Sequence, residues 1–149
     1  MIESLESESP EIQKKIRAEL SARQATYSGN DDVREALSNK TFTGIAGPFG
    51  IGKSMITDEV IRIEPSIKPI HTTMTRARKP EDPIGFRTSD EGVTYTSMLH
   101  AVRAGELVNY SVIPHSDIYG TFPKDFPDKY TIGPFLPGSI DHISRAGFE

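Results

Sequence analysis

The residues whose types and spacing best suit chemistry lie in one glycine-rich stretch, residues 44–56, which reads GIAGPFGIGKSMI. Gly47, Gly52, Lys53 and Ser54 satisfy the pattern G-x-x-x-x-G-K-[ST]. In such a loop, backbone N–H groups point at phosphate oxygens, and the helix that follows adds its positive N-terminal end. The lysine reaches the terminal phosphates and the serine hydroxyl binds Mg²⁺. The stretch therefore predicts a site for a nucleoside triphosphate with magnesium.

We assign the donor nucleotide, taken to be ATP, to this loop and the Mg²⁺ ion to Ser54. A glycine-rich turn without a ligand is the alternative interpretation, but the β-prone run before the loop and the helical run after it favour a phosphate site. Lys53 is also expected to be catalytic, because it neutralises the β- and γ-phosphates. The predicted ATP-binding residues are Gly47, Pro48, Phe49, Gly50, Ile51, Gly52, Lys53 and Ser54.

Three later stretches help to define the chemistry: HTTMTRARKPED at 71–82, GELVNYSVI at 105–113 and IYGT at 118–121. With the loop, they resemble guanylate kinases in order and approximate spacing over residues 41–121. In that family the loop reads like GPSGVGKS, and a Thr-Thr-Arg-x-x-Arg-x-Gly-Glu segment grips the phosphate of a nucleoside monophosphate. A Gly-Glu-Leu-x-Glu strand and a Tyr-Gly-Ser/Thr turn complete its acceptor site.

The resemblance implies an acceptor clamp, and the arginine segment can be aligned in more than one way. We prefer a one-residue gap, which puts Arg76, Arg78 and Glu81 on the motif and makes both arginines catalytic. Without the gap, Lys79 and Asp82 replace the second arginine and the glutamate. Arginine forks bind phosphate oxygens bidentately, which lysine cannot do. The predicted monophosphate-binding residues are Thr72, Arg76, Arg78, Glu81, Asn109, Tyr119 and Thr121.

The sequence also departs from the family pattern. Met74 occupies the first arginine position if HTT is aligned strictly, and Asn109 replaces the glutamate that reads the base. We expect this asparagine to weaken selectivity for guanine. The family's aspartate-rich strand should fall near YTIGPF, which contains no acid. The family also continues through further helices, including a lid with arginines, so we expect a fragment, a truncated chain or a degenerate relative.

The order of predicted elements indicates an α/β fold. Helices are expected over residues 9–20, 31–40, 53–63, 94–107 and 139–147, and strands over 41–47, 66–72, 107–113 and 118–122, while TIGPFLP is ambiguous. The resemblance specifies a mainly parallel sheet of the P-loop NTPase type, flanked by helices, with a small mixed insertion that binds the monophosphate. We expect residues 1–40 to be an N-terminal helical extension, with 1–9 disordered, and residues 41–149 to be the guanylate kinase-like P-loop domain.

Composition narrows the classes of partner that the protein is expected to bind. The net charge of −4 argues against a nucleic-acid binder, and we expect no membrane partner because no apolar run is long enough to span a bilayer. The chain has no cysteine, which is compatible with a cytoplasmic protein. The leading hypothesis is therefore ATP-dependent phosphoryl transfer to a nucleoside monophosphate such as GMP. The alternatives are a catalytically weak guanylate kinase-like binding or scaffold module and another P-loop phosphotransferase.

Overall fold

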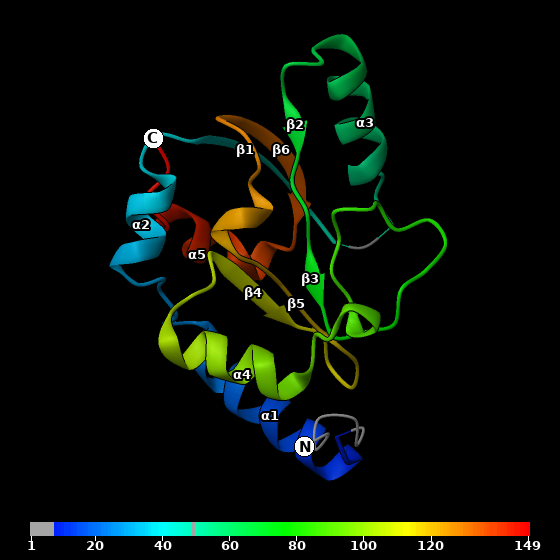
Figure 1. The fold of residues 1–149 in the computed structure, drawn as a ribbon, viewed down its shortest axis with the longest axis vertical. Coiled ribbons are helices and arrows are strands. Elements are labelled where there is room, and N and C mark those ends of the chain that lie inside the picture. The colour runs from blue at the N-terminus through cyan, green and yellow to red at the C-terminus, as the bar shows by residue number, and fades with distance from the viewer. Residues whose placement is uncertain (1–7, 49) are drawn as a thin grey trace.

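The computed structural model describes residues 8–48 and 50–149 and shows an α/β fold with two small sheets (Figure 1). The first sheet is parallel and has the strand order β1-β6-β2. The second is antiparallel and has the order β3-β5-β4. The strands are β1 (Thr41–Ala46), β2 (Lys68–Pro69), β3 (Thr73–Met74), β4 (Asn109–Val112), β5 (Ile118–Thr121) and β6 (Tyr130–Phe135).

Helix ends follow the capping residues in the sequence. Ser9 accepts a hydrogen bond from the N–H of Ile12, and Asn30 accepts one from Val33. None of the described helices has the length and apolar content needed to cross a bilayer. The helices are α1 (Pro10–Gln24), α2 (Asp31–Leu37), α3 (Lys53–Ile63), α4 (Tyr95–Ala104) and α5 (Ile140–Ser144), with short 3₁₀ turns η1 (Ser89–Glu91), η2 (Pro123–Asp125) and η3 (Pro137–Ser139).

The ambiguous stretch TIGPFLP contributes the central strand of the parallel sheet. β6 pairs with β1 along its whole length, from Thr41 opposite Tyr130 to Ala46 opposite Phe135. The glycine and proline in this stretch weaken its strand signal, and pairing on both sides overrides that local preference. β2 is shorter than predicted, and Pro69 lies on this edge strand, where a missing N–H is tolerated.

The predicted N-terminal extension packs into the body of the fold. α1 lies beside α4 beneath the antiparallel sheet (Figure 1), and Ile16, Leu20 and Tyr27 belong to the same apolar cluster as residues of α4, β4 and β5. The Tyr27 hydroxyl donates to the carbonyl of Leu107 at 2.6 Å and accepts from its N–H at 2.9 Å. This tyrosine therefore joins the extension, at a buried position, to the segment that leads into β4.

The prediction that residues 1–9 are disordered is wrong for Glu8 and Ser9. Ser9 caps α1, and the Glu8 carboxylate accepts hydrogen bonds from the N–H groups of Tyr95 and Thr96, both at 2.7 Å. A carboxylate is stabilised at this end of α4 by the helix dipole. The rest of the predicted disordered segment lies outside the described residues.

The inward face of α3 differs from the predicted one. We expected Met55, Ile56, Val60 and Ile63 to face the core, but Met55 and Ile63 are 77% and 68% exposed and Ile56 is half exposed. The buried residue of the helix is Thr57. Apolar residues surround most of this helix, so their spacing alone does not select one face.

The outer edge of β4 is covered by residues of η3 and α5. His142, which is buried, accepts a hydrogen bond from the Tyr110 N–H through Nδ1 at 3.3 Å, and its Nε2 donates to the Gln24 carbonyl at 2.5 Å. This arrangement requires the neutral imidazole. Burial lowers the pKa of His142 below its ordinary value, and it outweighs the hydrogen bond to the Gln24 carbonyl, which raises the pKa; Arg145 lowers it further and Asp141 raises it by less.

We expect the free energy of unfolding to decrease as the pH falls below 6.5, the ordinary histidine pKa. Below that pH the unfolded chain binds a proton that the folded His142 binds less readily, and the loss continues until the pH reaches the lowered folded pKa. His142→Gln keeps a donor and an acceptor but does not titrate, so urea unfolding should show a smaller pH dependence. An equal pH dependence in both proteins would contradict this assignment.

Candidate functional site

A pocket of about 540 Å³ lies between the carboxyl ends of β1 and β6 and one face of the antiparallel sheet. Ligands commonly bind at the carboxyl ends of parallel strands. The lining combines the glycine loop, residues 47–54, with the predicted acceptor segments. The described lining residues are Gly50, Gly52, Lys53, Ser54, Met55, Thr72, Met74, Arg76, Lys79, Asn109, Ser111, Tyr119, Gly120, Thr121, Pro134, Phe135 and Leu136.

The glycine loop turns directly from β1 into α3. Gly50 and Gly52 have φ values of 80° and 91°, a left-handed conformation that glycine adopts without strain. The Lys53 ammonium folds back and donates to the carbonyls of Gly47 at 2.6 Å and Pro48 at 2.5 Å. Of the predicted ATP-binding residues, Gly50, Gly52, Lys53 and Ser54 line the pocket, and Phe49 lies outside the described residues.

The first turn of α3 offers donors for an anion. Gly52 is the N-cap and supplies no side-chain cap, so the first N–H groups of the helix remain suited to phosphate oxygens. Ser54 lies in that turn and is exposed at the pocket. Within the described part of the chain, no group of three His, Cys, Asp or Glu residues could hold a metal ion. The hydroxyl of Ser54, the predicted Mg²⁺ ligand, is thus not joined at the pocket by a cluster of such residues in the described part of the chain.

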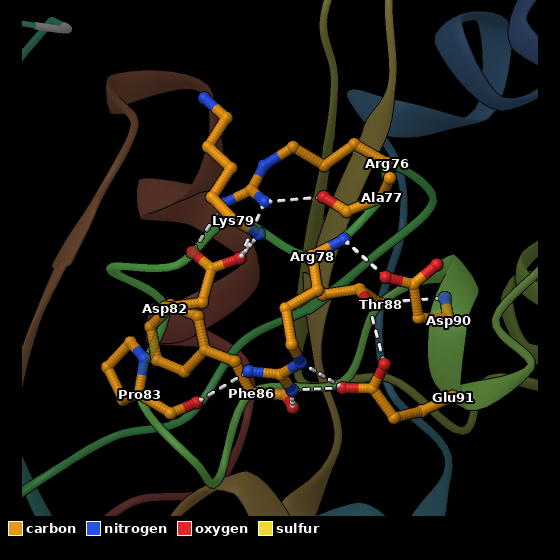
Figure 2. Close-up of polar contacts among 10 residues, drawn as sticks. All are labelled: Arg76, Ala77, Arg78, Lys79, Asp82, Pro83, Phe86, Thr88, Asp90 and Glu91. Carbon is orange, nitrogen blue, oxygen red and sulfur yellow. Dashed lines mark hydrogen bonds and ion pairs between the residues drawn. The ribbon is translucent and has the colours of Figure 1, made fainter.

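Arg76 lines the pocket. Its guanidinium is held by the carboxylate of Asp82 (Figure 2). Its Nη1 and Nη2 donate to the two oxygens of Asp82 at 2.7 and 2.9 Å, and the side chains are only 18% and 6% exposed. Hydrogen bonds to Arg76 hold the pKa of Asp82 well below its ordinary value, and Asp82 and then Tyr119 raise the pKa of Arg76. The Arg76 Nε is buried and has no hydrogen-bond partner among the described residues.

Arg78 does not line the pocket. Its guanidinium instead donates hydrogen bonds to residues of the loop that follows and of η1 (Figure 2). Its Nε donates to Glu91 at 2.7 Å, its Nη1 to the Pro83 carbonyl at 3.2 Å, and its Nη2 to Glu91 and the Phe86 carbonyl. The ion pair with Glu91 raises the pKa of Arg78. These contacts leave little donor capacity for a phosphate.

Lys79 reaches the pocket in place of Arg78. Glu81 is exposed and does not line the pocket either, whereas Asp82 contacts Arg76. The ungapped alignment, with Lys79 and Asp82 on the motif, therefore agrees with the geometry better than the gapped one that we preferred. The three-residue interval from Arg76 to Lys79 was the signal in the sequence.

The remaining predicted acceptor residues lie together on the pocket wall. Thr72, Asn109, Tyr119 and Thr121 line it, and Asn109 and Thr121 face each other across β4 and β5. Ser111 also lines it and was not predicted. In β4 it lies two residues from Asn109, which places both side chains on the same face of the sheet.

The charge of the lining is positive. Lys53, Arg76 and Lys79 line the pocket, and none of its described lining residues is acidic. β6 ends there with Pro134 and Phe135, and Leu136 follows directly, so the carboxyl end of this strand brings apolar surface rather than a carboxylate. The arrangement suits a ligand with anionic groups at one end and a flat, less polar body.

Comparison of the sequence with protein-family models gave no match, and neither did comparison with curated proteins. The resemblance to guanylate kinases consequently rests on the sequence motifs alone.

Arg78 and Lys79 are adjacent cations for which we expect opposite phenotypes. Lys79→Met should weaken pyrophosphate binding by about tenfold, because it removes a charge from the pocket, and should leave the melting temperature unchanged. Arg78→Met should lower the melting temperature and change the affinity little. Calorimetric titration and thermal melts of the two variants measure both quantities. If Arg78→Met weakens pyrophosphate binding and Lys79→Met lowers only the melting temperature, Arg78 rather than Lys79 belongs to the site.

Proposed function

We propose that this chain is a P-loop phosphotransferase of the guanylate kinase type, which transfers the γ-phosphoryl group of ATP to a nucleoside monophosphate. The observation that supports it is that the glycine loop and Arg76 line the same pocket. In this proposal, the parallel sheet is the P-loop core and the sheet β3-β5-β4 is the part that binds the monophosphate.

The chemistry requires placement of two anions rather than a general base. An oxygen of the acceptor phosphate is already nucleophilic; it bonds to the γ-phosphorus while the bond to the β,γ-bridging oxygen breaks, and ADP leaves. Lys53 and the first turn of α3 hold the donor phosphates. Arg76 and Lys79 hold the acceptor phosphate, and their charge offsets the repulsion between the reacting groups.

Asp82 leaves one edge of Arg76 for this task. The carboxylate takes one N–H from each of Nη1 and Nη2, the Ala77 carbonyl takes another from Nη1, and Tyr119 interacts with the guanidinium. In this proposal the acceptor phosphate approaches the edge formed by Nε and Nη2, beside Tyr119. Mg²⁺ would be held by Ser54 together with phosphate oxygens and water, and when bound it supplies further positive charge at the β- and γ-phosphates.

A binding module on the same fold is the second candidate. It is favoured by one observation: the described pocket lining provides no carboxylate to help Ser54 hold the metal. A coupled assay for ADP release, run with ATP against a panel of nucleoside monophosphates, separates the two functions. Binding of both nucleotides without turnover would support the module, and release that depends on the monophosphate supports the transferase.

Lys53→Ala should abolish most stabilisation of the protein by ATP–Mg²⁺, because it removes the main positive charge facing the β- and γ-phosphates. Thermal shift with increasing ATP measures this effect. Lys68→Ala is a matched control, because Lys68 is exposed on β2 and does not line the pocket. Equal stabilisation of wild type and Lys53→Ala would show that the loop does not bind the donor.

Arg76→Lys keeps the charge at the acceptor end and loses the planar fork. It should weaken monophosphate binding by about tenfold or more, with ATP binding nearly unchanged. Titrations of each nucleotide alone measure the two affinities. If ATP affinity falls instead, Arg76 serves the donor.

A further inference from the structure

The pocket has a neutral end that is distinct from its cationic end. This end is lined by Asn109, Ser111 and Thr121. The three residues are only 8%, 6% and 4% exposed, respectively. β4, which carries Asn109 and Ser111, lies across β5 from β3, and Arg76 follows β3. If the acceptor is a nucleotide with its phosphate at Arg76, as proposed above, its base faces this neutral wall.

The hydrogen-bond direction of Ser111 is set by a residue outside the pocket. The Ser139 hydroxyl is fully buried and donates its one proton to the Tyr110 carbonyl at 3.3 Å. The hydroxyls of Ser111 and Ser139 lie 2.9 Å apart. Either hydroxyl could donate in this pair, but the Tyr110 carbonyl can only accept, and a buried carbonyl left without a donor costs free energy. When Ser139 gives its proton to that carbonyl, Ser111 is the donor of the pair and presents only oxygen lone pairs to the pocket.

The neighbouring pair on the same wall also has a fixed direction. The Thr121 hydroxyl donates to the Asn109 amide oxygen. Thr121 therefore also offers lone pairs, and Asn109 offers the N–H groups of its amide. The wall thus combines accepting hydroxyls with a donating amide.

We infer that this wall selects acceptor nucleotides whose base carries an amino group beside an accepting ring nitrogen, and that Ser139 is the positioning residue for this choice. The amino N–H groups donate to Ser111 or Thr121, and the ring nitrogen accepts from Asn109. Adenine and cytosine have such an edge. Hypoxanthine and uracil have a carbonyl beside an N–H, which places oxygen against lone pairs and N–H against N–H.

Two matched pairs of ligands test the inference: AMP against IMP, and CMP against UMP. Groups left unpaired in a buried site typically cost about tenfold or more in affinity, so wild type should prefer the amino member of the pair that binds by about that factor. Ser139→Ala frees the Ser111 proton to turn into the pocket. The preference should then fall several-fold, with the affinity for ATP unchanged.

The control for loss of a buried hydroxyl is Thr131→Val. Thr131 is 1% exposed, its hydroxyl has no hydrogen-bond partner among the described residues, and it does not line the pocket. This variant should keep the wild-type preference. Ser111→Ala is a second test that does not depend on whether Ser139→Ala folds. It should weaken binding of the amino member of each pair and should not weaken binding of the carbonyl member.

The outcomes separate the inference from the proposed function. Binding of the monophosphates without preference in wild type, or an unchanged preference in both Ser139→Ala and Ser111→Ala, overturns the inference alone. If ATP binds and none of the four monophosphates does, the proposed acceptor site and the inference both fail.

Discussion

The pocket depends on one buried carboxylate at the junction of the two sheets. Asp125 is 2% exposed and accepts hydrogen bonds from the Thr73 hydroxyl at 3.0 Å and the Phe122 N–H at 2.9 Å, and its carbonyl accepts from the His71 N–H at 2.8 Å. The chain passes from β2 to β3 at Thr73 and from β5 towards β6 at Asp125. These bonds hold the connection between β2 and β3 against the connection between β5 and β6, where the two sheets meet. A buried carboxylate is tolerated here because its oxygens are hydrogen-bonded and Arg87 lies 3.4 Å away.

The second constraint is the crowding of cations around one cavity. Like charges in a partly buried site repel, so each needs local compensation. Lys53 is compensated by two loop carbonyls, and Arg76 by Asp82. A bound polyphosphate would replace the two neutral carbonyls as the partner of the Lys53 ammonium. The Arg76–Asp82 ion pair, by contrast, can persist while another edge of the guanidinium binds a phosphate. The two cations thus differ in how far they must rearrange when a ligand arrives.

Much of the fold could be predicted because its signals are local. Ser9, Asn30 and Gly105 mark helix ends by capping chemistry, and the run 53–63 is helical over the predicted residues. β6 could not be predicted with the same certainty, since its strand character comes from pairing with β1 and β2. The side-chain directions in the loop after β3, residues 75–88, were harder still to predict. Arg78 and Lys79 are adjacent cations, and only the contacts of Arg78 with Glu91 and two carbonyls show which of them turns away from the pocket.

The neutral wall shows a further limit of residue types as a guide to specificity. A serine or threonine hydroxyl can donate or accept, so Ser111 and Thr121 in a sequence define no hydrogen-bond direction. Asn109 as read from the sequence offers one acceptor and one donor, but Thr121 already uses its oxygen. The direction at Ser111 depends on where Ser139, which is distant in sequence and outside the pocket, directs its proton. A phosphate-binding end can attract any nucleotide, since all carry the same anionic group. Discrimination among bases must come from a few neutral hydrogen bonds, each of about 1–3 kcal/mol when mismatched, and hence from the buried neighbours that orient them.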